Sequence, residues 1–403
     1  MAVQRGARPT PPGRLLVAHP SPDLYGSDRQ LLETTAGALA AGWDVEVVVP
    51  HEGPLLPLLV QQGATVRVVP FPVLRKALLH PVRLPAFALA FVGASWRLAR
   101  ALRRRRVDVL YVNTVTIPVW IVAARLARVP VLCHVHEAEE DGPRLLSAAL
   151  TAPLLLADRV VTNSRAARAT LGRGAPRLAR RAVVVHNGVP GPDGPPAPST
   201  HEAGTPWQLA VVGRLSPRKG IDVALDALGL LAADGYDVRL SVCGTIFPGY
   251  EWYEEQLRAR ADEPDLRGLV QLRGYVHPTW PVLADADVVL VPSRAEPFGN
   301  TAVEGLLARR PVVASEVQGL AEVLLAERTG LLVPPGDPAA LARAVARLLD
   351  DDALRERLAT DGRADALERF TTDRYRADVV AELDRLHAGD EGPADGRHAR
   401  AAR

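Results

Sequence analysis

The chain is poor in cysteine and in long apolar runs. Only Cys133 and Cys243 occur among its 403 residues, and they fall in different predicted domains. We therefore expect no disulfide, which fits a reducing cytosol. No run approaches the roughly 20 apolar residues that span a bilayer, and the opening MAVQRGARPTPPGR lacks the apolar core of a signal peptide. A cytoplasmic protein is expected, either soluble or bound at the inner face of a membrane.

The chain also lacks an excess of either charge. Its 48 Lys and Arg residues nearly balance 46 Asp and Glu residues, which argues against a dedicated nucleic-acid binder. Lysine is scarce and occurs only at positions 76 and 219. Such a skew toward arginine is typical of coding bias, so a retained lysine is of interest. No G-x-G-x-x-G motif follows the first apolar run, so a dinucleotide-binding fold is not favoured.

Short apolar runs alternate with helical patterns along the whole chain. This alternation predicts the α/β class, with parallel sheets in Rossmann-like doubly wound domains. The length predicts two such domains. Because ligands bind off the carboxyl ends of parallel strands, we expect the two sheets to face one cleft. The expected segments are an N-terminal domain (14–189), a linker (190–206), a C-terminal domain (207–371), a helix packing back toward the N-terminal domain (372–388) and disordered tails (1–13 and 389–403).

The stretch from Asp285 to Val313 is predicted to form a strand, a loop, a helix and a strand. Glu296 lies in the loop, and Glu304 is expected two turns into the helix. The start of a helix binds anions, phosphate above all, because its N–H groups are unpaired and its dipole is positive there. A phosphate cradle with an acid on each side suggests a phosphorylated polyhydroxy ligand. The amides expected at this helix start belong to Phe298, Gly299, Asn300 and Thr301.

A second loop, Gly213 to Gly220, follows the first strand of the C-terminal half and carries Arg214 and Lys219. A guanidinium fork and a compact ammonium on such a loop suit a diphosphate. An Asp-x-Asp pattern occurs at Asp285 and Asp287, but it starts its strand, away from the ligand edge. No metal site is therefore predicted.

These two segments resemble motifs of the retaining GT-B glycosyltransferases of family 4. Glu-Pro-Phe-Gly at 296–299, with Glu304 eight residues after Glu296, is similar to the family's E-x7-E motif. GRLSPRKG at 213–220 is similar to its GRLxPxKG motif. The resemblance in motifs covers most of 208–336, and over the N-terminal half it is mainly one of strand–helix rhythm.

The resemblance implies roles for these residues. Glu296 would contact hydroxyls of the donor sugar and Glu304 the ribose, while Arg214 and Lys219 would neutralise the departing nucleoside diphosphate. The 298–301 amides would help to hold the sugar. Gly26-Ser27 partly matches a Gly-Gly loop whose amides approach the diphosphate. Tyr275 and Val276 follow another strand end and complete the expected donor-binding set.

Histidine ends a predicted strand at His136, where similar enzymes carry a histidine beside the sugar. Catalysis is therefore assigned to His136 together with Glu296, Arg214 and Lys219. We prefer His136 to His134, which is expected to point to the opposite face of the sheet. The neighbouring Glu137 is interpreted equally well as a solvated side chain.

Taken with the resemblance, these residues predict a metal-independent retaining glycosyltransferase with no cofactor. It would move sugar from a nucleoside-diphosphate sugar to a hydroxyl of a glycan or lipid-linked acceptor, and the N-terminal domain would be the acceptor side. The alternatives are a GT-B isomerase or phosphorylase and a non-catalytic sugar-nucleotide sensor. A phosphorylase needs a pyridoxal lysine, and the C-terminal half offers only Lys219.

The region 84–106 mixes apolar residues with arginines. One interpretation is an interfacial helix that contacts an anionic membrane surface. The other is a crossover helix that packs on the N-terminal sheet and leaves its arginine-rich end in water.

Overall fold

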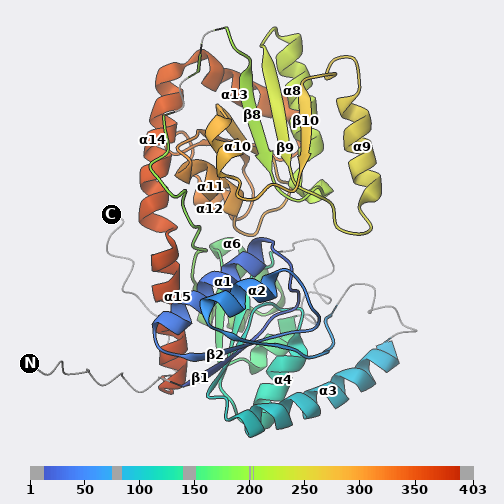
Figure 1. Ribbon diagram of the computed structural model, residues 1–403, viewed down its shortest axis with the longest axis vertical. Helices are drawn as coiled ribbons and strands as arrows, with labels where there is room; N and C mark the ends of the chain where they lie inside the picture. The colour runs from blue at the N-terminus through green and yellow to red at the C-terminus, as the bar shows by residue number, and fades with distance from the viewer. Residues whose placement is uncertain (1–12, 75–83, 139–150, 199–200, 203, 391–403) are drawn as a thin grey trace, which may run out of the picture. The chain divides into compact units, whose positions relative to one another are not determined.

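The computed structural model describes residues 13–74, 84–138, 151–198, 201–202 and 204–390. The described chain divides into two compact units (Figure 1). Unit 1 runs to Gly188 and also includes the segment from Thr372, and unit 2 is Val189–Thr371. The tails expected to be disordered lie almost entirely outside the described residues.

Unit 1 is built on a seven-stranded, all-parallel sheet with the order β3-β2-β1-β4-β5-β6-β7. The strand order reverses after β3: the chain crosses back, and β4 pairs with β1 at the centre of the sheet. The strands are β1 (Arg14–Ala18), β2 (Asp44–Val49), β3 (Thr65–Val68), β4 (Val109–Val112), β5 (Val131–Val135), β6 (Arg159–Thr162) and β7 (Val183–Val184).

Helices cover both faces of this sheet because its strands are apolar on both sides. Leu15 and Val17 of β1 pack with α1, α2 and α15, whereas Leu16 and Ala18 pack with α3 and α4. The helices are α1 (Gly26–Ala40), α2 (Leu55–Gln62), α3 (Leu84–Arg105), α4 (Pro118–Ala127), η2 (Ala152–Leu156), α6 (Arg165–Gly174), α7 (Pro176–Arg181) and α15 (Thr372–His387).

The C-terminal helix α15 packs against α1 within unit 1. The Tyr375 hydroxyl lies 2.6 Å from Thr34 Oγ1, and the Arg376 guanidinium bonds Glu33 at 2.9 Å. The indole of Trp43 donates to Asp384 at 3.2 Å. These contacts hold α15 against α1 and the turn that follows it.

Unit 2 repeats the plan with six parallel strands in the order β10-β9-β8-β11-β12-β13. The strands are β8 (Trp207–Val212), β9 (Val238–Cys243), β10 (Val270–Gly274), β11 (Val288–Val291), β12 (Val312–Ser315) and β13 (Leu331–Val333). The helices are η3 (Pro217–Lys219), α8 (Ile221–Ala233), α9 (Glu251–Ala261), α10 (Trp280–Asp285), α11 (Asn300–Leu307), α12 (Leu320–Val323), α13 (Pro338–Asp350) and α14 (Asp352–Arg369).

The predicted α/β class with two all-parallel sheets is therefore confirmed. Cys133 and Cys243 are buried in different units, and both are free. In the part of the chain that the structure describes, no helix is long and apolar enough to cross a membrane.

Candidate active site

Two loops meet at the switch point of unit 2, where β8 pairs with β11. They are the loop after β8 (213–220) and the loop after β11 (292–299). Gly220 has φ 65°, and a Cβ there would stand 2.0 Å from the carbonyl oxygen of Pro292. Arg294 N also donates to the Arg218 carbonyl at 2.8 Å. Only glycine fits this backbone contact, so the two predicted ligand loops form one surface.

Arg294 and Asp222 hold these loops together, a contact that the sequence did not reveal. The Arg294 guanidinium donates to both carboxylate oxygens of Asp222, at 2.8 and 2.6 Å, and to the Pro217 carbonyl at 2.8 Å. Burial raises the pKa of the Asp222 carboxyl, but the hydrogen bonds from Arg294 and Tyr253 outweigh it, so the net pKa is lowered. The pair fixes the loop that carries Lys219 against the loop that carries Glu296.

Lys219 and Glu296 are brought into direct contact as an ion pair. Glu296 is only 8% exposed, and the Ser293 hydroxyl lies 3.4 Å from the same carboxylate oxygen. Burial raises the pKa of Glu296, yet the positive charges of Lys219 and Arg218 outweigh it and leave the pKa below its ordinary value. Glu296 is therefore a buried carboxylate that can accept hydrogen bonds at neutral pH.

Arg214 lies on the same loop as Lys219 but faces an aromatic ring. Its guanidinium carbon is 3.3 Å from the centroid of Phe247, in the loop after β9. Stacking of this kind holds a guanidinium in place and leaves its edge able to donate hydrogen bonds. Phe247 is a supporting residue that had no distinguishing motif.

Helix α11 begins at Asn300 with Gly299 as its N-cap in the left-handed region, at φ 116°. Thr301 Oγ1 donates to the Val212 carbonyl at 3.2 Å, which ties the first turn of the helix to the end of β8. The side chain of Phe298 is buried in the core, so only its backbone can face a ligand. Glu304 is the fifth residue of α11, so the expected position two turns along was wrong.

Tyr275 and Val276 follow β10, near the edge of the sheet rather than at its switch point. Tyr275 is 49% exposed, and Val276 is partly buried against the core that contains α11.

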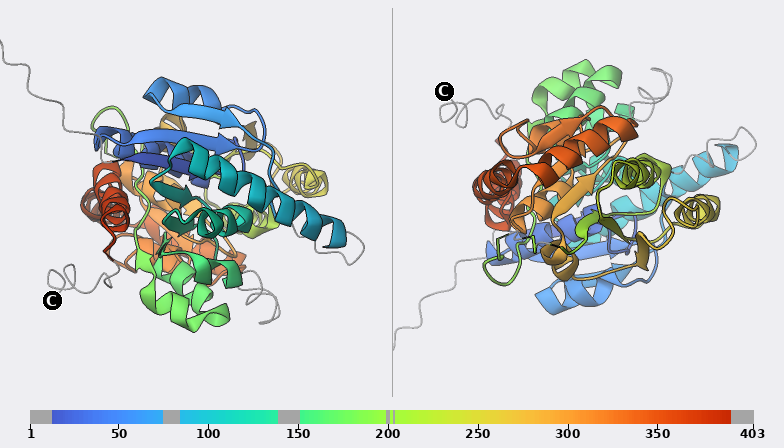
Figure 2. Two further views of the ribbon diagram at one scale, coloured as in Figure 1. Left: turned by 90° about the horizontal axis from the view of Figure 1, so that it is seen from below. Right: turned by 90° about the horizontal axis from the view of Figure 1, so that it is seen from above.

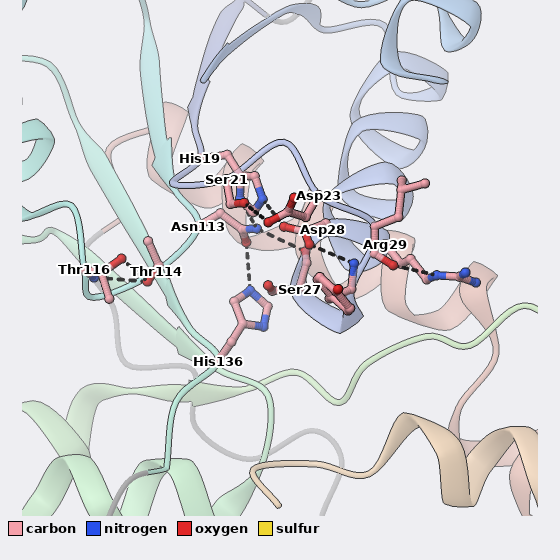
Figure 3. A network of polar contacts seen from close by, with 12 residues as sticks. His19, Ser21, Asp23, Ser27, Asp28, Arg29, Asn113, Thr114, Thr116 and His136 are labelled. Atoms are coloured by element: carbon pink, nitrogen blue, oxygen red, sulfur yellow. Dashed lines mark hydrogen bonds and ion pairs between the residues drawn. The ribbon is translucent and has the colours of Figure 1, made fainter. Parts of the chain in front are cut away.

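A chain of buried polar side chains occupies the corresponding switch point of unit 1 (Figure 3). His136 Nε2 lies 2.8 Å from Asn113 Oδ1, and Asn113 Nδ2 lies 3.0 Å from His19 Nδ1. His19 Nε2 is 2.6 Å from Asp28 Oδ1. These four residues come from the ends of β5, β4 and β1 and from α1.

Gly26 and Ser27 form the first turn of α1, so the expected loop at these positions was wrong. The helix starts early because the Asp28 carboxylate accepts a hydrogen bond from Tyr25 N at 2.8 Å. An acidic residue at this third helical position satisfies an otherwise unpaired amide. The Ser27 carbonyl is then 3.4 Å from Asn113 Nδ2.

His134 does not point away from His136, so that expectation was wrong. The two rings lie with centroids 4.1 Å apart and planes inclined by 32°. The physical reason is that residues two positions apart along a strand project to the same face. His134 is nevertheless fully buried, with its Nδ1 2.5 Å from the Tyr111 hydroxyl. The two histidines therefore differ in how deeply they are buried and not in the face to which they point.

His136 is a neutral ring. Burial and the neighbouring His19 lower its pKa to about 3. Glu137 beside it is half-buried and accepts hydrogen bonds from the Thr114 hydroxyl and from His136 N, the latter at 3.0 Å. Burial raises the pKa of Glu137. The polar end of β5 is therefore organised for hydrogen bonding rather than for charge.

Family models match both units. Residues 25–190 match the model described as glycosyltransferase family 4, and residues 197–365 match the model described as glycosyl transferases group 1. Together the two matches span most of the chain. The chain belongs to glycosyltransferase family 4.

Curated relatives of this family 4 chain include glycosyltransferases of different stated substrates. A D-inositol 3-phosphate glycosyltransferase of Jonesia denitrificans is 35% identical over 44% of this chain and 42% of its own length. A phosphatidyl-myo-inositol mannosyltransferase of Mycobacterium leprae is 40% identical over 38% of this chain and 40% of its own length. The match thus spans less than half the length of each relative.

Solved structures confirm the GT-B fold for this family 4 chain. Anabaena HepE, solved in complex with UDP and glucose, superposes with a TM-score of 0.77 at 22% identity. That match covers 92% of this chain and 99% of HepE. A sucrose-phosphate synthase of Thermosynechococcus elongatus superposes with a TM-score of 0.72, also at 22% identity, over 94% of this chain and all of that chain.

Proposed function

We propose that the protein is a retaining glycosyltransferase that needs no metal. It moves sugar from a nucleoside-diphosphate sugar to a hydroxyl of a glycan or a lipid-linked acceptor. The observation that carries this proposal is the surface formed by the two loops of unit 2, where Lys219 pairs with the buried Glu296. Both loops carry the family's motifs in the family's order.

The donor is proposed to bind on unit 2 through charge. Departure of the diphosphate leaves negative charge on its oxygens, and Arg214 and Lys219 supply two positive charges to stabilise it. These two charges are the support for metal independence. Glu296, with its lowered pKa, accepts hydrogen bonds from sugar hydroxyls. Glu304 accepts from the ribose, and the first-turn amides of α11 complete the donor site.

Transfer is proposed to occur on one face of the sugar. The bond from the anomeric carbon to the diphosphate oxygen breaks, and a bond to the acceptor oxygen forms on the same side. The proton of the acceptor hydroxyl leaves with the diphosphate. No side chain acts as nucleophile in this route, and we propose that His136 contributes as a hydrogen-bonding partner of a sugar hydroxyl.

A panel of sugar nucleotides tests the proposal, with UDP-sugars first because HepE was solved with UDP and glucose. Proton NMR of the released or transferred sugar reports whether the anomeric configuration is kept. We expect turnover with retention that is unaffected by a chelator. Binding without turnover would indicate the sensor instead, and conversion of the donor without transfer or hydrolysis would indicate an isomerase.

A membrane contact through α3 is also proposed, with anionic lipid as the occupant. Ala94, Leu98 and Leu102 bury one face of α3 against α4, so the expected crossover packing is present. The opposite face is apolar but exposed: Leu89 is 78%, Val92 55% and Trp96 57% exposed. The N-terminal half of α3 projects past α4 (Figures 1 and 2).

Arginines continue this exposed face toward the end of α3. Arg97, Arg103 and Arg105 bond the Pro70 carbonyl, the Leu126 carbonyl and Glu46. Arg100 and Arg104 are exposed and make no recorded contact with other described residues. Apolar side chains followed by cationic ones fit insertion beside anionic head groups, where each cation adds about 1 kcal/mol.

Vesicle co-sedimentation tests this contact. We expect binding to phosphatidylglycerol-containing vesicles at low salt and none to phosphatidylcholine vesicles. The R100Q/R104Q variant should bind about tenfold or more weakly. The R177Q/R180Q variant is the control, because it removes two exposed charges from α7. Absence of binding to anionic vesicles, or an equal loss in the control, would contradict the membrane contact.

A further inference from the structure

The chain of hydrogen bonds from Asp28 to His136 has a direction that its chemistry determines. Asn113 sits in the middle, 1% exposed, with one side-chain atom toward His19 and one toward His136. An asparagine amide has one end that only donates and one end that only accepts. The orientation of this amide therefore decides the tautomer of the ring on each side.

The Ser27 carbonyl fixes the orientation of the Asn113 amide. It lies 3.4 Å from Asn113 Nδ2, and a backbone carbonyl can only accept. With the amide turned over, Asn113 Oδ1 would face this carbonyl, so two acceptors would repel each other in a buried place. The NH₂ group therefore faces Ser27 and His19, and the oxygen faces His136 (Figure 3).

The His19 end of the chain agrees with this orientation. His19 Nδ1 faces the NH₂ group and must accept, so its proton is on Nε2. Nε2 then donates to Asp28 Oδ1 at 2.6 Å. The other oxygen of Asp28 is held by Tyr25 N at the start of α1. Every donor in the chain meets an acceptor, which is what buried polar groups require.

The Asn113 amide also determines the tautomer of His136. Asn113 Oδ1 accepts, so His136 carries its proton on Nε2 and leaves Nδ1 as a bare acceptor. Among the described residues no hydrogen-bond partner of Nδ1 is recorded. We propose that Asn113 is a positioning residue that holds His136 as the Nε2–H tautomer, so that Nδ1 accepts a hydrogen bond from a donor-sugar hydroxyl. The sugar as ligand rests on the proposed function, but the tautomer does not.

Nitrogen NMR of the full chain, labelled with ¹⁵N-histidine, tests the tautomer without any ligand. The His136 signals are identified by their absence from H136Q. We expect a protonated Nε2 and an unprotonated Nδ1 in the wild-type protein, and a mixture of tautomers in N113A. Y111F is the matched control, since it removes the neighbouring buried bond to His134 and should leave the His136 tautomer unchanged. A protonated Nδ1 in the wild-type protein would overturn the proposal.

Kinetics with deoxy-sugar donors tests the hydroxyl. N113A should lower kcat/KM by about tenfold with the complete donor, the size of one net hydrogen bond. With the deoxy donor that lacks the accepted hydroxyl, N113A should cause no further loss. An equal loss with every deoxy donor would show that Asn113 acts only through the fold and would overturn the positioning role. If no sugar nucleotide is turned over while the NMR spectrum shows the expected tautomer, the proposed function is contradicted and the tautomer assignment stands.

Discussion

The two units carry different kinds of side chain at the corresponding position of their two sheets. In both, the central pair of strands is the first strand of the unit and the one after the crossover, β1 with β4 and β8 with β11. Unit 2 carries charge there, in the Lys219–Glu296 and Arg294–Asp222 pairs. Unit 1 carries the hydrogen-bonded His19–Asn113–His136 chain, in which the His136 ring is neutral.

Under the proposed function, this difference would let one fold meet two requirements. A diphosphate needs positive charge, and charge acts over several ångströms without demanding a fixed angle. A sugar hydroxyl needs a donor or acceptor at a fixed distance and angle. Charged loops suit the first task, and a hydrogen-bonded network of largely buried side chains suits the second. Substitutions in the two units should therefore fail in different ways.

The largest effect is expected for Lys219→Ala. Removing one preorganised charge from the diphosphate site should lower turnover by roughly 10²-fold. The loop is held by Arg294 and Gly220 as well, so the fold should persist. The matched control is Arg347→Ala, which breaks an exposed pair with Glu327 in the same unit and should leave turnover unchanged. Steady-state kinetics checks both variants, and near-normal turnover of Lys219→Ala would contradict the diphosphate assignment.

A smaller effect should distinguish the role of Glu304 from that of Glu296. Glu304→Ala should weaken binding of the free nucleoside diphosphate by about tenfold, through loss of a charged hydrogen bond to the ribose. Glu296→Ala should not weaken that binding, because it leaves the positive charge of Lys219 in place, yet it should damage transfer. Calorimetry and kinetics on the same samples measure the two effects. Equal loss of nucleotide affinity in both variants would contradict the proposal that Glu304 binds the ribose and Glu296 the sugar.

The smallest effect concerns pH and unit 1. The pKa of His136 falls from its ordinary 6.5 to about 3 in the folded chain, so the unfolded chain binds the extra proton between these values. Stability should therefore fall as pH drops below about 6.5, at up to about 1.4 kcal/mol per pH unit for this group.

His136→Gln should reduce that decline, and His51→Gln, which changes an exposed histidine, should not. Unfolding midpoints of the three proteins at about pH 5 and pH 7 give the comparison. If His136→Gln declines as steeply as the parent, the ring is not held neutral by the fold.

Much of the fold could be predicted from local pattern. The helix predicted at 372–388 is present as α15 (Thr372–His387), and the strand, loop, helix and strand predicted between Asp285 and Val313 are β11, its loop, α11 and β12. Helix α2 is hard to recognise from local pattern because Pro57 interrupts its apolar run. A proline in the first turn costs nothing, because the N–H it lacks has no partner within the helix there.

The residues of the candidate site also differ in whether a local sequence pattern reveals them. Lys219 and Glu296 stand in motifs, so both could be named from the sequence. The partners Asp222, Phe247 and His19 could not, because strand order brings them together and no local pattern records it. Asn113 directly follows β4, but its role depends on which amide atom faces the Ser27 carbonyl, and no sequence pattern records that.

Calorimetric titration with nucleoside diphosphates tests the contrast between the units most directly. The full chain, Lys219→Ala and Asn113→Ala are titrated with the diphosphate that binds the parent best. We predict that Lys219→Ala weakens binding by about tenfold or more, with the difference shrinking as salt rises. Asn113→Ala should bind within about twofold of the parent, since it changes no charge. Equal weakening by both substitutions, or by neither, would contradict the assignment of the diphosphate to the charged loops of unit 2.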